Sequence, residues 1–305
     1  MTSDSPEYHR PVLVAEVLGA AHGARKIVDG TLGGGGHAAA FLEAGAEVLA
    51  IDRDPKAMAA ARRRIGEGGI HYLEADFTSP EALDAIRDFA PEFILLDLGV
   101  SSRQLDEDER GFSFRPGVPL DMRMGGAGVS AAALLNTASE ARLRSIFAEY
   151  GDERRAGRLA REVVRRRGGH PFATSDDLVN AIRAVLGPRS GPPDFARLFQ
   201  AVRIAVNDEL EGLTRSLPLL RDALAPGGRL AVISYHSGED RIVKQAFREW
   251  CQQCVCPPEA VVCTCRGRPL GSLEPRKPIH PSDVEIAANA RARSATLRIF
   301  RRAEA

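Results

Sequence analysis

A glycine-rich segment follows an early apolar stretch of the chain, and its composition suits a turn whose backbone approaches a ligand closely. Residues 26–29 predict a short buried strand, residues 30–37 read Gly-Thr-Leu-Gly-Gly-Gly-Gly-His, and residues 38–42 predict a helix. A strand, a glycine turn and a helix in this order direct the free N–H groups of the helix start toward a bound group. The segment therefore predicts a binding site, although a tight turn without a ligand would also use glycine.

Carboxylates occur where successive strands are expected to end. Asp29, Asp52 and Asp97 end or directly follow apolar runs, and Asp76 follows the run 70–74. Because the carboxyl ends of parallel strands meet at one edge of a sheet, we expect these four side chains to converge there. Each aspartate could separately cap a helix, but four independent caps at four strand ends would be a coincidence.

Two cofactors bind at such an edge, a dinucleotide through its pyrophosphate or S-adenosylmethionine through its amino acid part. A carboxylate at Asp29 would repel pyrophosphate but suits a cationic amine. The pair Asp76-Phe77 offers a polar group and an aromatic face for adenine, whereas Asp52 would hold ribose hydroxyls in either case. The step Pro226-Gly227-Gly228 before a later strand resembles class I methyltransferases. The residues favour S-adenosylmethionine, with a nicotinamide-dependent oxidoreductase as the alternative.

The elements that position these residues alternate between strand and helix. Apolar runs predict strands at 26–29, 46–51, 70–74, 93–96, 229–235 and 296–300, and helices are expected at 56–64 and 207–225. This alternation predicts a doubly wound α/β sheet, of the Rossmann-like class I methyltransferase type. Residues 103–128 look like a loop and residues 130–199 look helical throughout. We therefore expect a cofactor-binding domain at 1–102 and 201–305, with an inserted all-helical substrate-recognition domain at 103–200.

Composition sets limits on the class of protein. The 305 residues include 44% hydrophobic and 27% charged residues, which suffices for a globular core. No run of about 18 apolar residues predicts a membrane-spanning helix, and the polar start of the chain lacks a signal-peptide core. A cytoplasmic protein without a membrane partner is expected. The balanced net charge does not indicate or exclude nucleic acid, and the oligomeric state stays open.

Long stretches of the chain resemble the bacterial ribosomal RNA small subunit methyltransferase H family, formerly called MraW. The similarity extends nearly from end to end. Its motifs are His9-Arg10-Pro11-Val12-Leu13, Asp29-Gly30-Thr31, Gly35-Gly36-His37, Ala50-Ile51-Asp52-Arg53-Asp54, Leu95-Leu96-Asp97-Leu98-Gly99 continuing to Gln104-Leu105-Asp106, Arg110-Gly111-Phe112-Ser113-Phe114, Pro119-Leu120-Asp121-Met122-Arg123-Met124, Phe199-Gln200-Ala201-Val202-Arg203, Ser234-Tyr235-His236-Ser237 and Arg291-Ala292-Arg293-Ser294.

The resemblance implies an activity and a set of binding residues. The family moves the methyl group of S-adenosylmethionine to the exocyclic N4 amine of a cytidine in the decoding region of 16S ribosomal RNA, which implies a substrate within the small ribosomal subunit. It implies cofactor contacts at Gly35, Gly36, His37, Asp52, Phe77, Asp97 and Gln104, to which the strand-end and loop patterns add Gly34 and Asp76. A non-catalytic RNA-binding factor with a vestigial cofactor pocket is a third hypothesis, which the intact loop and carboxylates disfavour.

Methylating a cytosine amine sets chemical demands, because the lone pair of that nitrogen is delocalised into the ring. The nitrogen must be aligned with the methyl group, and an acceptor must stabilise the charge that develops on it. Other amine methyltransferases use Asp or Asn followed by Pro-Pro and an aromatic residue, whereas this chain has Asp97-Leu98-Gly99-Val100. We predict Asp97 and His236 as catalytic candidates, with base stacking supplied from elsewhere. Candidates for stacking are Phe112, Phe114 and Tyr235.

A basic helix is expected over residues 152–167. Arg154, Arg158, Arg161 and Arg165 would lie on one face, opposite an apolar face, and the alternative to RNA binding is a charged surface exposed to solvent. Arg197 and Arg203 are further candidates for RNA contact.

All five cysteines fall between residues 251 and 265. The pairs Cys254-x-Cys256 and Cys263-x-Cys265 could hold a structural zinc ion. Reduced thiols without a metal, or disulfides, are the alternatives, and the sequence favours them over zinc.

Overall fold

The structure, a computed structural model, describes residues 11–257, 260 and 262–304. His9 and Arg10 of the first matched motif lie outside these residues. The chain divides into two compact units. The first unit comprises the chain up to Gly99 together with the chain from Leu210 onward, and the second unit is Val100–Glu209. The sequence predicts the corresponding bounds at 102/103 and 200/201.

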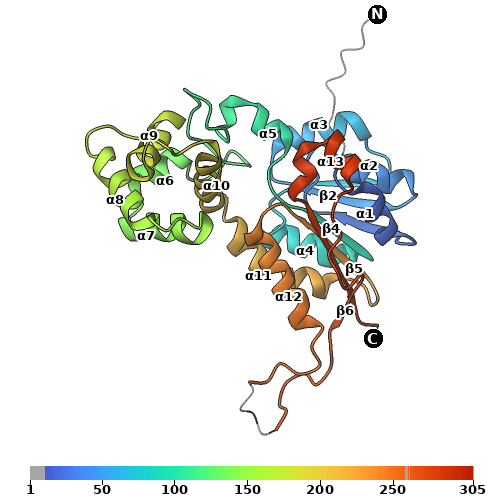
Figure 1. Ribbon diagram of the computed structural model, residues 1–305. Helices are drawn as coiled ribbons and strands as arrows, with labels where there is room; N and C mark the ends of the chain where they lie inside the picture. Colours follow the sequence, from blue (N-terminus) through green and yellow to red (C-terminus); the bar gives the residue numbers. More distant parts are fainter. Residues whose placement is uncertain (1–10, 258–259, 261, 305) are drawn as a thin grey trace, which may run out of the picture. The chain divides into compact units, whose positions relative to one another are not determined.

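The first unit is built on one sheet, seven-stranded in the described residues, with the order β3-β2-β1-β4-β5-β7-β6. Its first five strands run parallel, and β7 pairs antiparallel with both β5 and β6. The predicted doubly wound α/β fold is confirmed (Figure 1). The strands are β1 (Lys26–Asp29), β2 (Glu47–Asp52), β3 (Ile70–Glu74), β4 (Phe93–Asp97), β5 (Arg229–Ser234), β6 (Gly271–Leu273) and β7 (Thr296–Arg302).

Helices cover both faces of this sheet, because alternate strand residues point to opposite sides. In β4, Phe93 and Leu95 pack into one apolar cluster while Ile94 and Leu96 pack into the other. The first cluster includes residues of α1 (Val14–Ala21), α2 (Gly36–Glu43) and α3 (Pro55–Ile65). The second includes residues of α4 (Pro80–Phe89), α11 (Glu209–Ala223) and α12 (Ser237–Trp250).

Local sequence fixes where the helices that follow β2 and β3 begin. Asp54 caps α3 by accepting a hydrogen bond from the Lys56 amide, and Ser79 caps α4 by accepting one from the Ala82 amide. Each cap is followed by a proline at the first helical position, where no N–H is needed. These starts make the loops short and hold the strand ends in place.

The strand order reverses between β1 and β4. The chain runs from β1 through β2 to β3 on one side of the sheet, and from β4 to β5 on the other. Open α/β sheets bind ligands at the carboxyl ends of the strands next to such a reversal. Asp29 and Asp97 end the two strands that flank it. The topology therefore singles out these two carboxylates.

The second unit is helical and has its own apolar core. Its helices are α5 (Ser102–Asp106), α6 (Ala131–Thr137), α7 (Glu140–Ser145), α8 (Ala156–Arg167), α9 (Ser175–Leu186) and α10 (Pro192–Asn207), with a π-helical turn at Ile146–Tyr150. Residues such as Phe147, Leu159 and Leu198 are fully buried in its core. No helix of the described residues is both long and apolar enough to cross a membrane.

Two sequence predictions differ from the second unit as observed. The expected loop 103–128 contains α5 and a 3₁₀ turn at Asp108–Arg110, which Arg110 supports by donating to the carbonyl oxygen of Met124 at 2.6 Å. The helix expected from 207 to 225 is present as α11, but it starts two residues later than predicted. Asp208 adopts a left-handed conformation with φ of 52°, so α10 ends at Asn207 and α11 begins at Glu209.

Candidate cofactor site and basic surface

The glycine loop after β1 is fastened to the end of β2. The amide of Gly33 donates to Asp52 Oδ2 at 2.7 Å, and the Leu32 amide donates to the Ile51 carbonyl oxygen at 2.9 Å. Gly33 and Gly35 have φ values of 51° and 73°, which side chains other than glycine rarely adopt. The loop is therefore a fixed backbone cradle that opens onto the first turn of α2.

Asp29 is the most deeply buried acid at this edge, with 1% of its surface exposed. Its Oδ1 accepts a hydrogen bond from the Thr31 amide at 3.2 Å, whereas Oδ2 has no hydrogen-bond partner among the described residues. Burial raises the pKa of Asp29 to about 6, and His37 partly opposes that effect. A buried carboxylate oxygen without a donor is suited to a cationic ligand group such as an amino acid amine.

Asp52 lies at the end of β2 with each carboxylate oxygen engaged by one backbone amide. Oδ2 accepts from Gly33, and Oδ1 accepts from Asp54 at 2.8 Å. Each oxygen keeps a further lone pair, so ribose hydroxyls could still donate to it. Burial raises the pKa of Asp52, and the two amide bonds oppose that rise.

The Asp76-Phe77 pair follows β3, as its position in the sequence suggests. Asp76 is held from two sides, since Oδ2 accepts from Arg53 Nη1 at 2.7 Å and Oδ1 accepts from the Thr78 amide at 2.9 Å. Phe77 is half-buried and packs against the apolar cluster on one face of the sheet. Asp76 therefore shapes the turn, while Phe77 offers the aromatic surface.

Asp97 ends β4 and is partly exposed, with 23% of its side chain accessible. Tyr235 donates its hydroxyl to Asp97 Oδ1 at 2.8 Å, and His37 Nε2 lies 3.7 Å from Asp97 Oδ2. The Asp97 amide donates to Thr31 Oγ1 at 2.6 Å, which ties β4 to the glycine loop. Burial and the neighbouring Asp97 carboxylate raise the pKa of Tyr235, so the phenol stays a hydrogen-bond donor.

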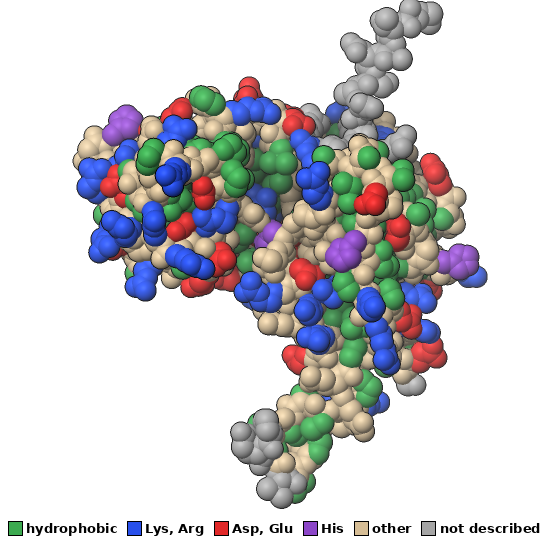
Figure 2. Space-filling model, viewed as in Figure 1, with side chains coloured by type: hydrophobic (Ala, Val, Ile, Leu, Met, Phe, Trp, Pro, Cys, Tyr) green, Lys and Arg blue, Asp and Glu red, His purple; other side chains and the backbone are tan. Residues whose placement is uncertain are grey.

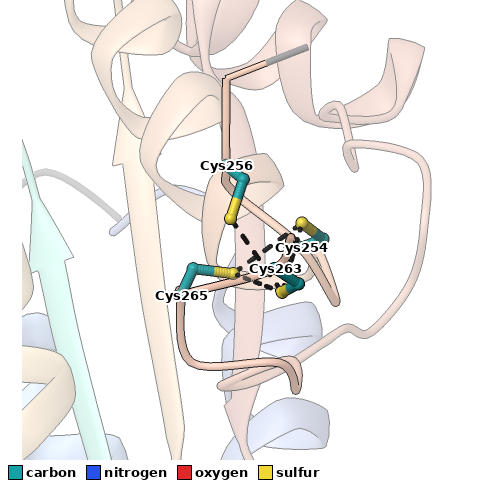
Figure 3. Close-up of side chains that lie close together, drawn as sticks. All are labelled: Cys254, Cys256, Cys263 and Cys265. Carbon is teal, nitrogen blue, oxygen red and sulfur yellow. Dashed lines mark hydrogen bonds between the residues drawn. The ribbon is translucent and has the colours of Figure 1, made fainter. Parts of the chain in front are cut away.

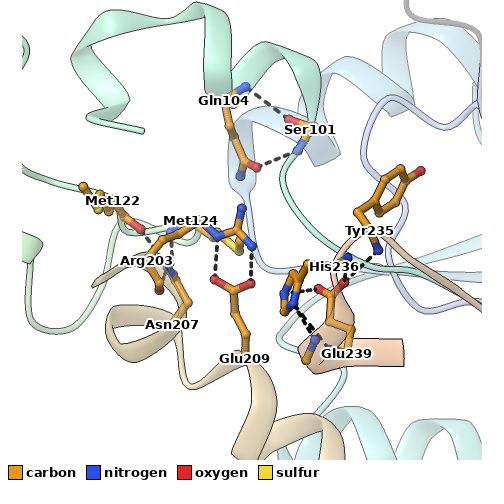
Figure 4. A network of polar contacts seen from close by, with 11 residues as sticks. Ser101, Gln104, Met122, Met124, Arg203, Asn207, Glu209, Tyr235, His236 and Glu239 are labelled. Atoms are coloured by element: carbon orange, nitrogen blue, oxygen red, sulfur yellow. Dashed lines mark hydrogen bonds and ion pairs between the residues drawn. The ribbon is translucent and has the colours of Figure 1, made fainter. Parts of the chain in front are cut away.

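His236 caps α12 (Figure 4). Its Nδ1 accepts from the amides of Gly238 at 3.2 Å and Glu239 at 3.4 Å, and Nε2 lies 3.2 Å from Glu239 Oε1. Glu239 is 2% exposed and its Oε2 also accepts from the Tyr235 amide at 2.9 Å. This arrangement favours a positioning role for His236, in which it holds the segment that carries Tyr235.

Sequence reasoning misses two contributors to this edge. Thr31 bonds both aspartates that flank the strand-order reversal, and Glu239 holds the backbone of Tyr235. The position of Tyr235 directly after β5 could have indicated its contact with Asp97, because β5 is the neighbour of β4. The sequence suggests Tyr235 only for base stacking, not as a hydrogen-bond donor.

Gln104 and two of the stacking candidates belong to the second unit. Gln104 lies on α5, and its Oε1 accepts from the Ser101 amide at 3.0 Å (Figure 4). Phe112 is 8% exposed and Phe114 packs edge-on against Phe195 and Phe199, so both are part of the core of that unit. The packing of both rings favours a structural role, and base stacking by Phe112 or Phe114 stays a prediction.

The second unit carries a basic surface over α7 and α8 (Figure 2). Arg158, Arg161 and Arg165 are exposed on α8, while Leu159, Ala160 and Val163 of the same helix are buried. A Cβ atom placed on Gly157 would lie 3.9 Å from Cδ of Arg144, so this exposed arginine of α7 lies next to the first turn of α8. Arg165 pairs with Glu162 at 2.7 Å, whereas Arg158 and Arg161 form no ion pair with the acids of the described residues.

Three of the predicted RNA-contacting arginines are placed differently from expectation. Arg154 is exposed but precedes α8, because the buried Glu153 accepts from the Arg155 amide and starts the helix at Ala156. Arg197 is held by Glu153 at 2.7 Å. Arg203 binds both carboxylate oxygens of Glu209 at 2.9 Å and is 13% exposed, which favours a structural role (Figure 4).

The sheet order, the glycine cradle after β1 and the carboxylates at successive strand ends define a class I methyltransferase, a fold that uses S-adenosylmethionine. A model of the MraW methylase family matches residues 7–303, and the chain belongs to that family. The chain is 59% identical over 301 residues to a ribosomal RNA small subunit methyltransferase H from Gemmatimonas aurantiaca, covering 97% of this chain and 96% of that one.

Two further comparisons give lower identities. A ribosomal RNA small subunit methyltransferase H from Heliobacterium modesticaldum is 45% identical, with 95% of this chain and 97% of that one covered. The crystal structure of an rRNA methylase from Streptococcus thermophilus gives a TM-score of 0.41 at 12% identity, covering 96% of this chain and 93% of that one. Membership of a methylase family decides against the oxidoreductase alternative.

Proposed function

We propose that this protein transfers the methyl group of S-adenosylmethionine to the N4 amine of a cytidine in the decoding region of 16S ribosomal RNA. The observation that carries methyl transfer is the pair Asp29 and Asp97 at the strand-order reversal, joined through Thr31. The choice of RNA rests on the family and on the names of its relatives. The choice of the cytidine N4 amine rests on the motif resemblance.

The residues of the first unit suit the parts of the cofactor. Asp29 would take the amino group, the amides of Gly34 and Gly36 the carboxylate, Asp52 the ribose hydroxyls and Phe77 the adenine. The Gly35 amide instead closes the loop by donating to the Leu32 carbonyl oxygen at 2.8 Å, so Gly35 would contribute its backbone shape. The motif resemblance adds Gln104 as a further proposed contact. When bound, S-adenosylmethionine supplies a methyl group activated by a sulfonium.

The residues at Asp97 suit an amine acceptor. A carboxylate oxygen can accept a hydrogen bond from the exocyclic amine and stabilise the positive charge that develops on its nitrogen. Tyr235 fixes the orientation of that carboxylate through its hydroxyl, and His236 and Glu239 hold the segment that carries Tyr235. The proton can pass to water after the new bond forms, so the protein needs no proton relay.

Calorimetric titration tests the cofactor assignment most simply. S-adenosylmethionine is expected to bind one site per chain, whereas NAD is expected to give no saturable heat, because pyrophosphate would meet the carboxylate of Asp29. Saturable binding of NAD with no response to S-adenosylmethionine would overturn the proposal.

Reversing charge on α8 is expected to weaken RNA binding. Arg158→Glu with Arg161→Glu should lower the affinity for small-subunit RNA. The slope of log binding constant against log salt concentration should become shallower by about two, roughly 0.9 for each phosphate that the protein no longer neutralises. Filter binding over a range of salt concentrations measures both quantities.

The matched control is Arg158→Lys with Arg161→Lys, which preserves charge and should keep the wild-type salt slope. An unchanged slope in the charge-reversed protein would show that this surface of α8 does not contact the RNA. Binding of S-adenosylmethionine should be the same in all three proteins.

A further inference from the structure

The chain between α12 and β6 is a long loop that holds every cysteine of the protein. Among its described residues, 251–270 contain no helix and no strand. The two ends of the loop are joined by a hydrogen bond, in which the Leu270 amide donates to the carbonyl oxygen of Trp250 at 2.7 Å. Trp250 in turn packs against Phe247 and Phe300 in the core of the first unit. The base of the loop is therefore anchored, and its outer part needs another source of order.

Four of the cysteines meet in that outer part (Figure 3). The sulfur of Cys263 lies 3.8 Å from that of Cys254, 3.9 Å from that of Cys256 and 3.6 Å from that of Cys265. The sulfurs of Cys254 and Cys265 are 3.8 Å apart, and all four lie within 4.8 Å of one another. Four of the six separations are therefore 3.6 to 3.9 Å and the other two are at most 4.8 Å, so the sulfurs form one compact cluster.

We propose that Cys254, Cys256, Cys263 and Cys265 bind one zinc ion. Zinc coordinated by four thiolates at about 2.3 Å places its ligands about 3.8 Å apart, the edge of a regular tetrahedron of that radius. The observed separations of 3.6 to 3.9 Å agree with this edge. None of these pairs is joined by a disulfide in the structure, since a disulfide holds its sulfurs at about 2.05 Å, and all five cysteines are free.

The surroundings of the sulfurs are those of metal-bound thiolates. The Val255 amide donates to Cys265 Sγ at 3.3 Å, and such amide bonds orient a ligand and stabilise its negative charge. Arg266 joins the loop to the last turn of α12 by donating to the carbonyl oxygen of Glu249, and it also donates to that of Gln252 just after the helix. The metal would thus be tied to α12 through the residue next to one of its ligands.

Apolar packing cannot replace the metal in this loop. Val255 and Val262 are 37% and 69% exposed, so the loop buries little apolar surface of its own. Four contacting thiols would contribute little, whereas the binding free energy of a structural zinc ion contributes directly to folding. A sulfur-only tetrahedral site favours zinc, and a single iron ion is the competitor with the same geometry.

Four protein ligands leave no open coordination position, so the proposed site is structural and takes no part in methyl transfer. Its failure would accordingly leave the proposed function intact. The expected consequence is order in the loop, and the sheet core beneath it should not depend on the metal.

Metal analysis of the full-length protein tests the proposal. Protein purified without chelators should carry about one zinc ion per chain by mass spectrometric elemental analysis. Cys256→Ser and Cys263→Ser should each lose the ion or hold it at least tenfold more weakly in a competition with a chromogenic chelator. Cys251→Ser is the matched control and should retain it, because Cys251 is not one of the four clustered cysteines.

Two readouts keep the test independent of folding failures. Replacing zinc with cobalt in wild-type protein should produce the intense visible absorption of tetrahedral cobalt thiolates. Circular dichroism and binding of S-adenosylmethionine should stay unchanged in the serine variants. Protein without metal whose four thiols all react with a thiol reagent, protein with disulfides among them, or protein that holds iron instead would each overturn the proposal.

Discussion

Protein carrying Asp97→Asn is expected to bind S-adenosylmethionine nearly as well as wild type and to methylate RNA about 100 to 1000 times more slowly, the range for loss of one preorganised electrostatic group. Asparagine preserves the volume of the side chain and can still accept from the Tyr235 hydroxyl, which lies 2.8 Å from Asp97 Oδ1. It removes the negative charge that stabilises the amine during transfer. Single-turnover methylation with saturating cofactor measures the effect without product release.

The matched control for Asp97 is Tyr235→Phe. It removes only the hydroxyl that orients the carboxylate, so the rate should fall by about tenfold, the loss expected for one hydrogen bond of about 1.4 kcal/mol. A larger loss of methylation rate in Tyr235→Phe than in Asp97→Asn would show that the Tyr235 hydroxyl, and not the Asp97 carboxylate, contributes more to methyl transfer. Near-normal methylation by Asp97→Asn would remove Asp97 from the catalytic residues.

Asp29→Asn is expected to weaken binding of S-adenosylmethionine by about a hundredfold. The buried Oδ2 of Asp29 has no donor in the described residues, so the amine of the cofactor would be its charged partner. Removing one member of a buried charged pair costs roughly 2–5 kcal/mol. Calorimetry at neutral pH measures the affinity, and an affinity within threefold of wild type would refute this assignment.

The same substitution changes how stability depends on pH. The folded-state pKa of Asp29 is raised from 3.8 to about 6, so its ionisation destabilises the fold as pH rises through that interval. The shift of about two pKa units corresponds to roughly 3 kcal/mol of unfolding free energy, lost between about pH 4 and pH 6 and constant above. In Asp29→Asn this contribution disappears, so the variant gains stability relative to wild type as pH rises.

Urea unfolding measures the free energy of unfolding of wild type and Asp29→Asn at about pH 4 and about pH 7. The prediction concerns how the difference between the two proteins changes from one pH to the other. The comparison cancels any fixed cost of burying an amide in place of a carboxylate, because that cost is the same at both pH values. An unchanged gap between the two proteins across this pH range would contradict a raised pKa for Asp29.

The parallel strands can be predicted because they are buried on both faces. Phe93–Leu96 alternates between two apolar clusters, which leaves no polar residue in the run and makes it conspicuous in the sequence. β6 is only three residues long, Gly271–Leu273, and shows no such pattern. Its pairing with β7 depends on how the chain returns from the cysteine loop, which local composition does not encode.

The site is predictable in its acids and less so in the residues that hold them. Asp29, Asp52 and Asp97 follow apolar runs, so topology alone brings them to one edge. The bond from Tyr235 to Asp97 joins residues 138 positions apart, and only the order of β4 and β5 in the sheet makes them neighbours. Helical spacing places Arg154 on the basic helix because the pattern of arginines extends beyond the first residue of α8. The helix begins only at Ala156, after a turn in which Glu153 accepts a hydrogen bond from the Arg155 amide.

Helix ends in the second unit present the same difficulty. The sequence around Asp208 predicts a helix starting at 207, yet a single left-handed residue separates α10 from α11. Asn207 explains part of this break, since its side chain accepts from the Met124 amide at 2.9 Å and donates to the carbonyl oxygen of Met122 at 2.7 Å. Such contacts across 83 and 85 residues lie beyond any local pattern.

The most direct test of the proposed function is the identity of the nucleoside that receives the methyl group. Purified protein is incubated with unmethylated small ribosomal subunits and S-adenosylmethionine carrying a deuterated methyl group, and the 16S RNA is digested and analysed by mass spectrometry. The label is expected on the exocyclic nitrogen of one decoding-region cytidine, and Asp97→Asn protein should leave that cytidine essentially unlabelled. Label on a ring carbon or on another base, or no label with active cofactor-bound protein, would contradict the proposed function.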